Sequence, residues 1–148
     1  AVGEINVVKR MQQTGAVIGG EGNGGVINPD LHYGRDALVG AAMVLQLLAE
    51  RKISASAYRA ELPDYRIIKE KIALDDLGME AGQVLERLET VWAARLPDTT
   101  DGVKIDFEQG WVHFRKSNTE PIVRLYAEAK SEEEARTLAE EVLAGIRN

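Results

Sequence analysis

Hydrophobic and polar positions follow two different periods along the second half of the chain. Apolar residues return at helical spacing over residues 84–95 and again from Ala135 onward. Strand-like segments, one of them with strict apolar–charged alternation, cover residues 65–74, 103–107, 111–115 and 122–129. Ser131 and Glu134 predict a capping box at the start of the last helix. The order β-α-β-β-β-α predicts an α+β domain whose helices pack on one face of a sheet.

The first half of the chain predicts a second, separate unit. Its pattern favours helices over residues 4–14 and 34–52 and short buried strands over residues 16–18 and 26–27. The helix over 34–52 is apolar on almost every side, so we expect it to be sandwiched in a core. Pro63 stops the last helical turn of this unit, and residues 61–64 are the predicted boundary.

The composition indicates a globular protein with a substantial hydrophobic core and argues against several functional classes. Of 148 residues, 45% are hydrophobic and 28% are charged, and disordered chains lack this apolar content. The net charge of −6 argues against nucleic acid and anionic membranes as partners. Residues 37–48, the longest apolar run, fall well short of the ~20 residues of a membrane span. The lack of cysteine favours the cytoplasm, and a start without Met or signal features suggests a processed chain or part of a longer protein.

The first candidate for chemistry is the glycine run Gly19-Gly20-Glu21-Gly22-Asn23-Gly24-Gly25. Glycine lets the backbone approach a ligand closely, and a glutamate and an asparagine in such a loop can bind hydroxyl groups. A plain tight connection between two strands is the alternative interpretation. Neither a P-loop nor a dinucleotide fingerprint fits, because no Gly-Lys-Ser/Thr follows and no helix opens directly after the run.

The second candidate is the segment Arg115-Lys116-Ser117-Asn118-Thr119-Glu120-Pro121 between two predicted strands, with Arg124 soon after it. Hydroxyl and amide side chains together with successive backbone N–H groups can line an anion site, and a guanidinium suits phosphate bidentately. The alternative is a polar hairpin loop that satisfies its own backbone. His32 and His113 belong to no acid–base–nucleophile pattern, and Glu132-Glu133-Glu134 is better explained by a helix N-terminus than by a metal.

Together, the two segments resemble the phosphohexomutase superfamily of phosphoglucomutases, phosphomannomutases and phosphoglucosamine mutases. Gly20–Gly24, followed by His32-Tyr33-Gly34-Arg35-Asp36, is similar to its sugar-recognition loop, and residues 115–121 are similar to its phosphate-binding loop. The resemblance implies that residues 1–60 are the C-terminal part of sugar-binding domain 3, a partial α/β unit. It further implies that residues 64–148 are phosphate-binding domain 4, with a fold like the TATA-box-binding protein.

The resemblance also implies an activity, the exchange of hexose 1-phosphate and hexose 6-phosphate through a bisphosphate. The family's phosphoserine and Mg²⁺ loops are absent from this sequence, so the chain alone is expected to be inactive and to contain neither catalytic nor metal-binding residues. Its partners would be hexose or hexosamine phosphates and the remaining N-terminal domains. The implied sugar-binding residues are Glu21, Gly22 and Asn23, and the implied phosphate-binding residues are Arg115, Ser117, Asn118, Thr119 and Arg124. A non-catalytic module for sugar phosphates or other anions, and a purely structural domain, are the alternatives.

Overall fold

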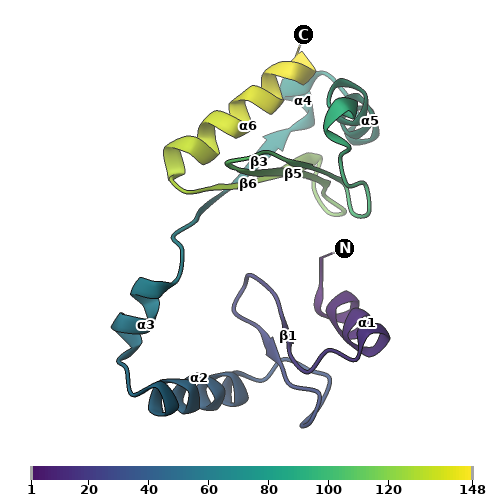
Figure 1. Ribbon diagram of the computed structural model, residues 1–148. Coiled ribbons are helices and arrows are strands. Elements are labelled where there is room, and N and C mark those ends of the chain that lie inside the picture. The colour runs from purple at the N-terminus through teal and green to yellow at the C-terminus, as the bar shows by residue number, and fades with distance from the viewer. Residues whose placement is uncertain (1, 148) are drawn as a thin grey trace. The chain divides into compact units, whose positions relative to one another are not determined.

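The computed structural model describes residues 2–147 and divides the chain into two compact units, Ala1–Pro63 and Asp64–Asn148. The first unit contains three helices and a hairpin, and the second contains a sheet covered by helices (Figure 1). No helix within residues 2–147 is both long and apolar enough to cross a membrane.

The first unit begins with helix α1 (Glu4–Thr14), whose bounds match the predicted helix. Gly15 ends it in the left-handed conformation, at φ 65°. Val8 and Met11 form the buried side of α1 and pack on Ile27, and these three are the buried apolar side chains among the described residues of the unit.

A two-stranded antiparallel hairpin follows, formed by β1 (Gly19–Gly20) and β2 (Val26–Ile27). The predicted buried strand over residues 16–18 is therefore wrong: pairing starts only at Gly19, and Val17 is 79% exposed. Gly19 allows a close approach to α1, because a Cβ there would overlap the Sδ atom of Met11 and this side chain would have to move. The strand thus starts where the backbone can pass close beneath α1.

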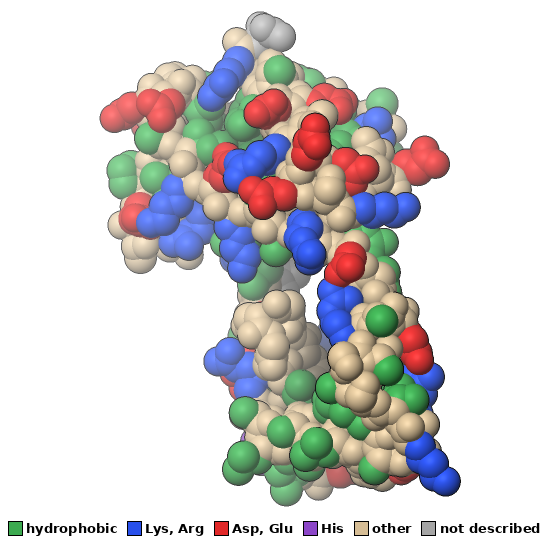
Figure 2. Space-filling model, turned by 90° about the vertical axis from the view of Figure 1, so that its left-hand side faces the viewer, with side chains coloured by type: hydrophobic (Ala, Val, Ile, Leu, Met, Phe, Trp, Pro, Cys, Tyr) green, Lys and Arg blue, Asp and Glu red, His purple; other side chains and the backbone are tan. Residues whose placement is uncertain are grey.

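Helices α2 (Ala37–Arg51) and α3 (Ala55–Glu61) complete the first unit, and the side chains of Asp36 and Ser54 cap their N-termini. The expectation that α2 is sandwiched in a core is wrong within this unit. Gly40 is its only buried residue, and Leu38 is 83% exposed. Figure 2 shows hydrophobic side chains, in green, at the surface of this unit.

The second unit is built on a four-stranded antiparallel sheet in the order β3-β6-β5-β4. Its strands are β3 (Arg66–Ala73), β4 (Val103–Asp106), β5 (Gly110–Lys116) and β6 (Ile122–Ala129). The helices are α4 (Leu74–Leu77), α5 (Ala81–Val91), the 3₁₀ turn η1 (Ala93–Arg95) and α6 (Glu132–Arg147). The predicted β-α-β-β-β-α order is confirmed, with the short helix α4 as an addition.

One face of this sheet is buried and the other is open. Alternate residues of β6 are buried. Helix α6 lies along one face of the sheet (Figure 1) and has six buried residues. Because side chains alternate along a strand, the intervening polar residues all point to the face without helices. The candidate phosphate-binding residues lie on this open face and in the loop at its edge.

Candidate functional site

The glycine loop of the first unit is a tight turn between β1 and β2. The Glu21 N–H donates to the carbonyl of Gly25 at 3.2 Å, and the Gly24 N–H donates to the carbonyl of Glu21 at 3.1 Å. Gly24 has φ 88°, which favours glycine, and a Cβ on Gly25 would lie 2.5 Å from Cδ of Arg35. The backbone conformation at Gly24 and the close approach of the Arg35 side chain to Gly25 therefore account for these two glycines.

Glu21 and Asn23 lie side by side at the tip of this loop. Asn23 Nδ2 donates to Glu21 Oε2 at 3.4 Å, the Gly3 N–H donates to Glu21 Oε1 at 3.0 Å, and the Gly25 N–H donates to Asn23 Oδ1 at 3.0 Å. A carboxylate has about four acceptor positions and an amide nitrogen has two donor hydrogens, so both side chains keep free capacity. No atom lies within 4 Å of a Cβ placed on Gly22, so the chain leaves space above the turn.

The residues after the loop stabilise their own unit. Arg35 Nε donates to Glu4 Oε2 at 2.8 Å, and the Leu38 and Val39 N–H groups donate to the Asp36 carboxylate at 2.8 and 2.9 Å. The bond from Val39 is the main cause that lowers the pKa of Asp36, and His32, 3.3 Å away, adds to it. A shallow hollow of about 490 Å³, lined by the glycine loop and the start of α2, lies beside these groups.

The second candidate loop, residues 117–121, connects β5 to β6 and is held at both ends by backbone hydrogen bonds. The Ser117 N–H donates to the carbonyl of Ile122, and the Leu74 N–H donates to the carbonyl of Pro121, both at 3.2 Å.

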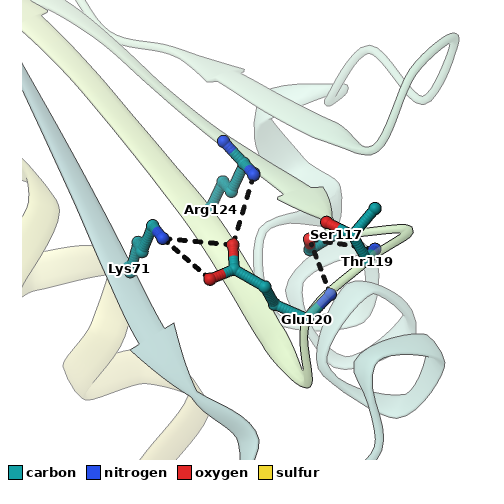
Figure 3. A network of polar contacts seen from close by, with 5 residues as sticks. All are labelled: Lys71, Ser117, Thr119, Glu120 and Arg124. Atoms are coloured by element: carbon teal, nitrogen blue, oxygen red, sulfur yellow. Dashed lines mark hydrogen bonds and ion pairs between the residues drawn. The ribbon is translucent and has the colours of Figure 1, made fainter.

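The N–H groups in the middle of this loop are weakly engaged. Ser117 Oγ accepts from the Thr119 and Glu120 N–H groups at 3.4 and 3.3 Å, which is long for such bonds (Figure 3). The Asn118 N–H donates to no group among residues 2–147. Two of three successive amides are thus held only by long bonds to a single hydroxyl oxygen, and the third donates to no described group.

Two candidate arginines meet on the open face of the sheet. Cross-strand register places Arg115 of β5 directly opposite Arg124 of β6. Arg115 Nη2 pairs with the Asp101 carboxylate at 3.0 Å, and Arg124 Nη2 pairs with the Glu120 carboxylate at 3.4 Å. Arg115 Nε is buried and has no hydrogen-bond partner among the described residues.

Sequence reasoning missed Lys71, which joins this cluster from β3. Lys71 lies opposite Arg124, and its Nζ donates to both carboxylate oxygens of Glu120 at 2.8 and 3.1 Å (Figure 3). The bond from Lys71 lowers the pKa of the Glu120 carboxyl, with Arg124 as a further cause. The usable signal was strand alternation, because Ile68 and Ile72 are buried and Lys71 must then point to the open face.

His113, which belongs to no catalytic pattern in the sequence, supports Arg115 indirectly. Its Nε2 donates to the backbone carbonyl of Asp101 at 2.6 Å, and the Asp101 carboxylate holds Arg115. Burial lowers the pKa of His113, so the ring is neutral at pH 7 and carries its proton on Nε2. No group of three His, Cys, Asp or Glu side chains within residues 2–147 has an arrangement that could hold a metal ion.

Both candidate loops lie in segments that match known protein families. Residues 70–145 match "Phosphoglucomutase/phosphomannomutase, C-terminal domain", and residues 1–65 match "Phosphoglucomutase/phosphomannomutase, alpha/beta/alpha domain III". The chain belongs to the phosphoglucomutase/phosphomannomutase family. The suspected relationship to phosphohexomutases is thereby confirmed.

The similarity to individual members of the family extends over nearly the whole of this chain. It is 41% identical over 140 residues to a phosphoglucomutase/phosphomannomutase of Thermococcus kodakarensis, with 94% of this chain and 30% of the relative covered. It is 34% identical over 143 residues to a phosphoglucosamine/phosphogalactosamine mutase of Sulfurisphaera tokodaii, with 95% and 31% covered. A crystal structure of a phosphoglucomutase/phosphomannomutase family protein from Burkholderia thailandensis superposes with a TM-score of 0.76 at 25% identity, with 99% and 31% covered. The chain thus spans about a third of the length of these family members.

Proposed function

We propose that this chain is the substrate-holding part of a phosphohexomutase, which exchanges hexose 1-phosphate and hexose 6-phosphate through a bisphosphate. In this proposal, residues 1–60 are the C-terminal part of the sugar-binding domain and residues 64–148 are the phosphate-binding domain. Family membership and the names of the relatives, which include a phosphoglucomutase/phosphomannomutase, support the reaction class.

The observation that carries the proposal is the set of weakly engaged backbone amides in the loop over residues 117–121. Its weakly engaged amides lie at the edge of the face on which Arg115 and Arg124 are cross-strand neighbours. We call this arrangement the phosphate grip. It would bind a phosphate group whichever sugar carbon carries it. It therefore suits a reaction in which first one end and then the other end of the bisphosphate must be held. Ser117, Asn118 and Thr119 complete the proposed grip.

The glycine loop supplies the proposed sugar contacts. Glu21 accepts hydrogen bonds from hydroxyl groups, Asn23 both donates and accepts, and Gly22 leaves the approach open. These residues bind and orient the sugar and transfer no phosphoryl group. A phosphoserine donor and Mg²⁺, which the family resemblance implies, are assigned in this proposal to parts of the protein outside these 148 residues.

Binding and turnover, measured separately, test the proposal. The 148-residue chain should bind inorganic phosphate in a ¹H–¹⁵N NMR titration, with the largest shifts over residues 115–121, and Ser117→Ala should weaken this binding. The chain alone should not turn over glucose 1-phosphate, and EDTA-sensitive turnover by it would contradict the assignment. A non-catalytic anion-binding module is the second candidate, and it would bind phosphate but show no mutase activity in the full-length protein either.

A further inference from the structure

The open face of the sheet carries a row of three cations whose charge is partly cancelled by two carboxylates. Register aligns Lys71 on β3 with Arg124 on β6, and Arg124 with Arg115 on β5. Glu120 pairs with the first two cations, and Asp101 pairs with the third. These five side chains together have a net charge of +1. An arriving phosphate must compete with both carboxylates for the arginines.

Glu120 is held unequally by its two cations. Lys71 reaches both of its oxygens, at 2.8 and 3.1 Å, whereas Arg124 reaches one of them at 3.4 Å (Figure 3). The looser partner is the one that can turn toward a phosphate. The lowered pKa of Glu120 keeps its carboxylate ionised at neutral pH. Without Lys71, this negative charge would fall on Arg124 alone and on the amides of its own loop.

We propose that Lys71 is a positioning residue for phosphate binding: it neutralises Glu120 and thereby leaves Arg124 available to the phosphate. The inference rests on the proposed phosphate grip and adds to it a residue from another strand, outside the loop. Lys71 acts through Glu120 and does not itself touch the phosphate. The effect of removing Lys71 must therefore disappear when the charge of Glu120 is removed as well.

Four variants that change charges on this face of the sheet test the mechanism. Lys71→Met lowers the net charge of the five-residue cluster to zero, Glu120→Gln raises it to +2, and the double variant restores +1. Lys69→Met is the matched control, because Lys69 lies on the same strand and the same face and carries the same charge. The measurement is the Kd of the 148-residue chain for inorganic phosphate by NMR at constant ionic strength, with thermal unfolding of every variant to verify folding.

We expect Lys71→Met to weaken phosphate binding about three- to fivefold, the range that an exposed ion pair supports. Glu120→Gln should tighten binding, the double variant should bind within about twofold of Glu120→Gln, and Lys69→Met should change the Kd by less than about 1.5-fold. Equal effects of Lys71→Met and Lys69→Met would overturn the inference. Weaker binding by Glu120→Gln, or a double variant as weak as Lys71→Met, would also overturn it.

Ser117→Ala separates failure of this inference from failure of the proposed function. If Ser117→Ala weakens phosphate binding while Lys71→Met does not, the grip exists and the role of Lys71 is wrong. If neither variant has an effect, or the wild-type chain binds no phosphate, the proposed grip is wrong and the inference falls with it.

Discussion

At the scale of single residues, the planar geometry of Arg115 is the most direct test of the proposed grip. A lysine keeps the charge but loses the fork that can bind two phosphate oxygens at once. A charge-assisted hydrogen bond contributes roughly 1.5–3 kcal/mol. We therefore expect Arg115→Lys to lower kcat/KM of the full-length protein about tenfold or more. Arg136→Lys, an exposed change on α6, is the control and should leave kcat/KM unchanged; equal kinetics for both variants would mean that Arg115 does not hold the phosphate.

Glu21 and Asn23 lead to a prediction about the sugar. A bisphosphate that turns end over end roughly exchanges its 3- and 4-hydroxyls, so one loop that serves both orientations should read this pair. An axial 4-hydroxyl would leave a hydrogen-bonding partner unpaired, at a cost of roughly 1–3 kcal/mol. We expect the full-length protein to use glucose and mannose 1-phosphates within about tenfold of each other, and galactose 1-phosphate at least about tenfold less well.

Assays of the three sugar phosphates side by side decide this point. The Sulfurisphaera tokodaii relative is named for phosphogalactosamine as well as phosphoglucosamine, so galactose 1-phosphate is the informative substrate. If it is turned over as well as glucose 1-phosphate, Glu21 and Asn23 do not read the 4-hydroxyl. Glu21→Gln and Asn23→Asp should then leave the ratio of the two substrates unchanged.

The sequence allowed the loop residues to be predicted more readily than their partners. Ser117 and Arg115 stand in a contiguous motif, and short-range spacing is enough to find such a motif. Lys71, Asp101 and Glu120 enter the cluster through strand order and register, which depend on contacts between distant segments. Alternation along the strand could place Lys71 on the open face, but its pairing with Glu120 could not be predicted until the neighbouring strand was known.

At the scale of elements, the capping box of α6 is a local device that the sequence predicts completely. The Glu134 N–H donates to Ser131 Oγ and the Ser131 N–H donates to Glu134 Oε2, both at 3.1 Å. We expect Ser131→Ala to lower the free energy of unfolding by about 0.5–2 kcal/mol, because an N-terminal amide of the helix loses its acceptor. Thr137→Ala on the same helix removes a hydroxyl that bonds only to its own preceding turn, and chemical denaturation should show a smaller loss for it. Equal losses would mean that the cap is not stabilising.

Helix α2 is an element whose ends can be predicted from the local sequence but whose burial cannot. Its ends follow from local chemistry, since Asp36 caps the N-terminus and Lys52 takes the left-handed conformation at the C-terminus. Its burial does not, because burial depends on which other segments cover an apolar surface. Leu38 and Leu45 are 83% and 67% exposed, so the apolar pattern predicted the helix correctly and its surroundings incorrectly.

At the scale of the whole molecule, the two units have very different cores. Eighteen buried hydrophobic residues form one cluster in the second unit, whereas the buried cluster among residues 2–63 has three members, Val8, Met11 and Ile27. Burial of apolar surface is the main favourable contribution to folding, so the first unit has much less to offset its chain entropy. It is therefore expected to open at a lower free energy than the second unit.

Native-state hydrogen exchange measures this difference within one sample. Amides of α1 and α2 should exchange at least about tenfold faster than amides of β5, β6 and α6, after correction for intrinsic rates. Measurement at two pH values serves as the control. Exchange rates that are proportional to hydroxide concentration report the free energy of the opening reaction, whereas exchange rates that do not depend on pH report its rate constant. Both sets of amides come from the same chain, so solution conditions cannot create the contrast. Protection of α1 and α2 equal to that of β6 would contradict this expectation. It would show that residues 2–63 are stabilised by more than their three buried side chains.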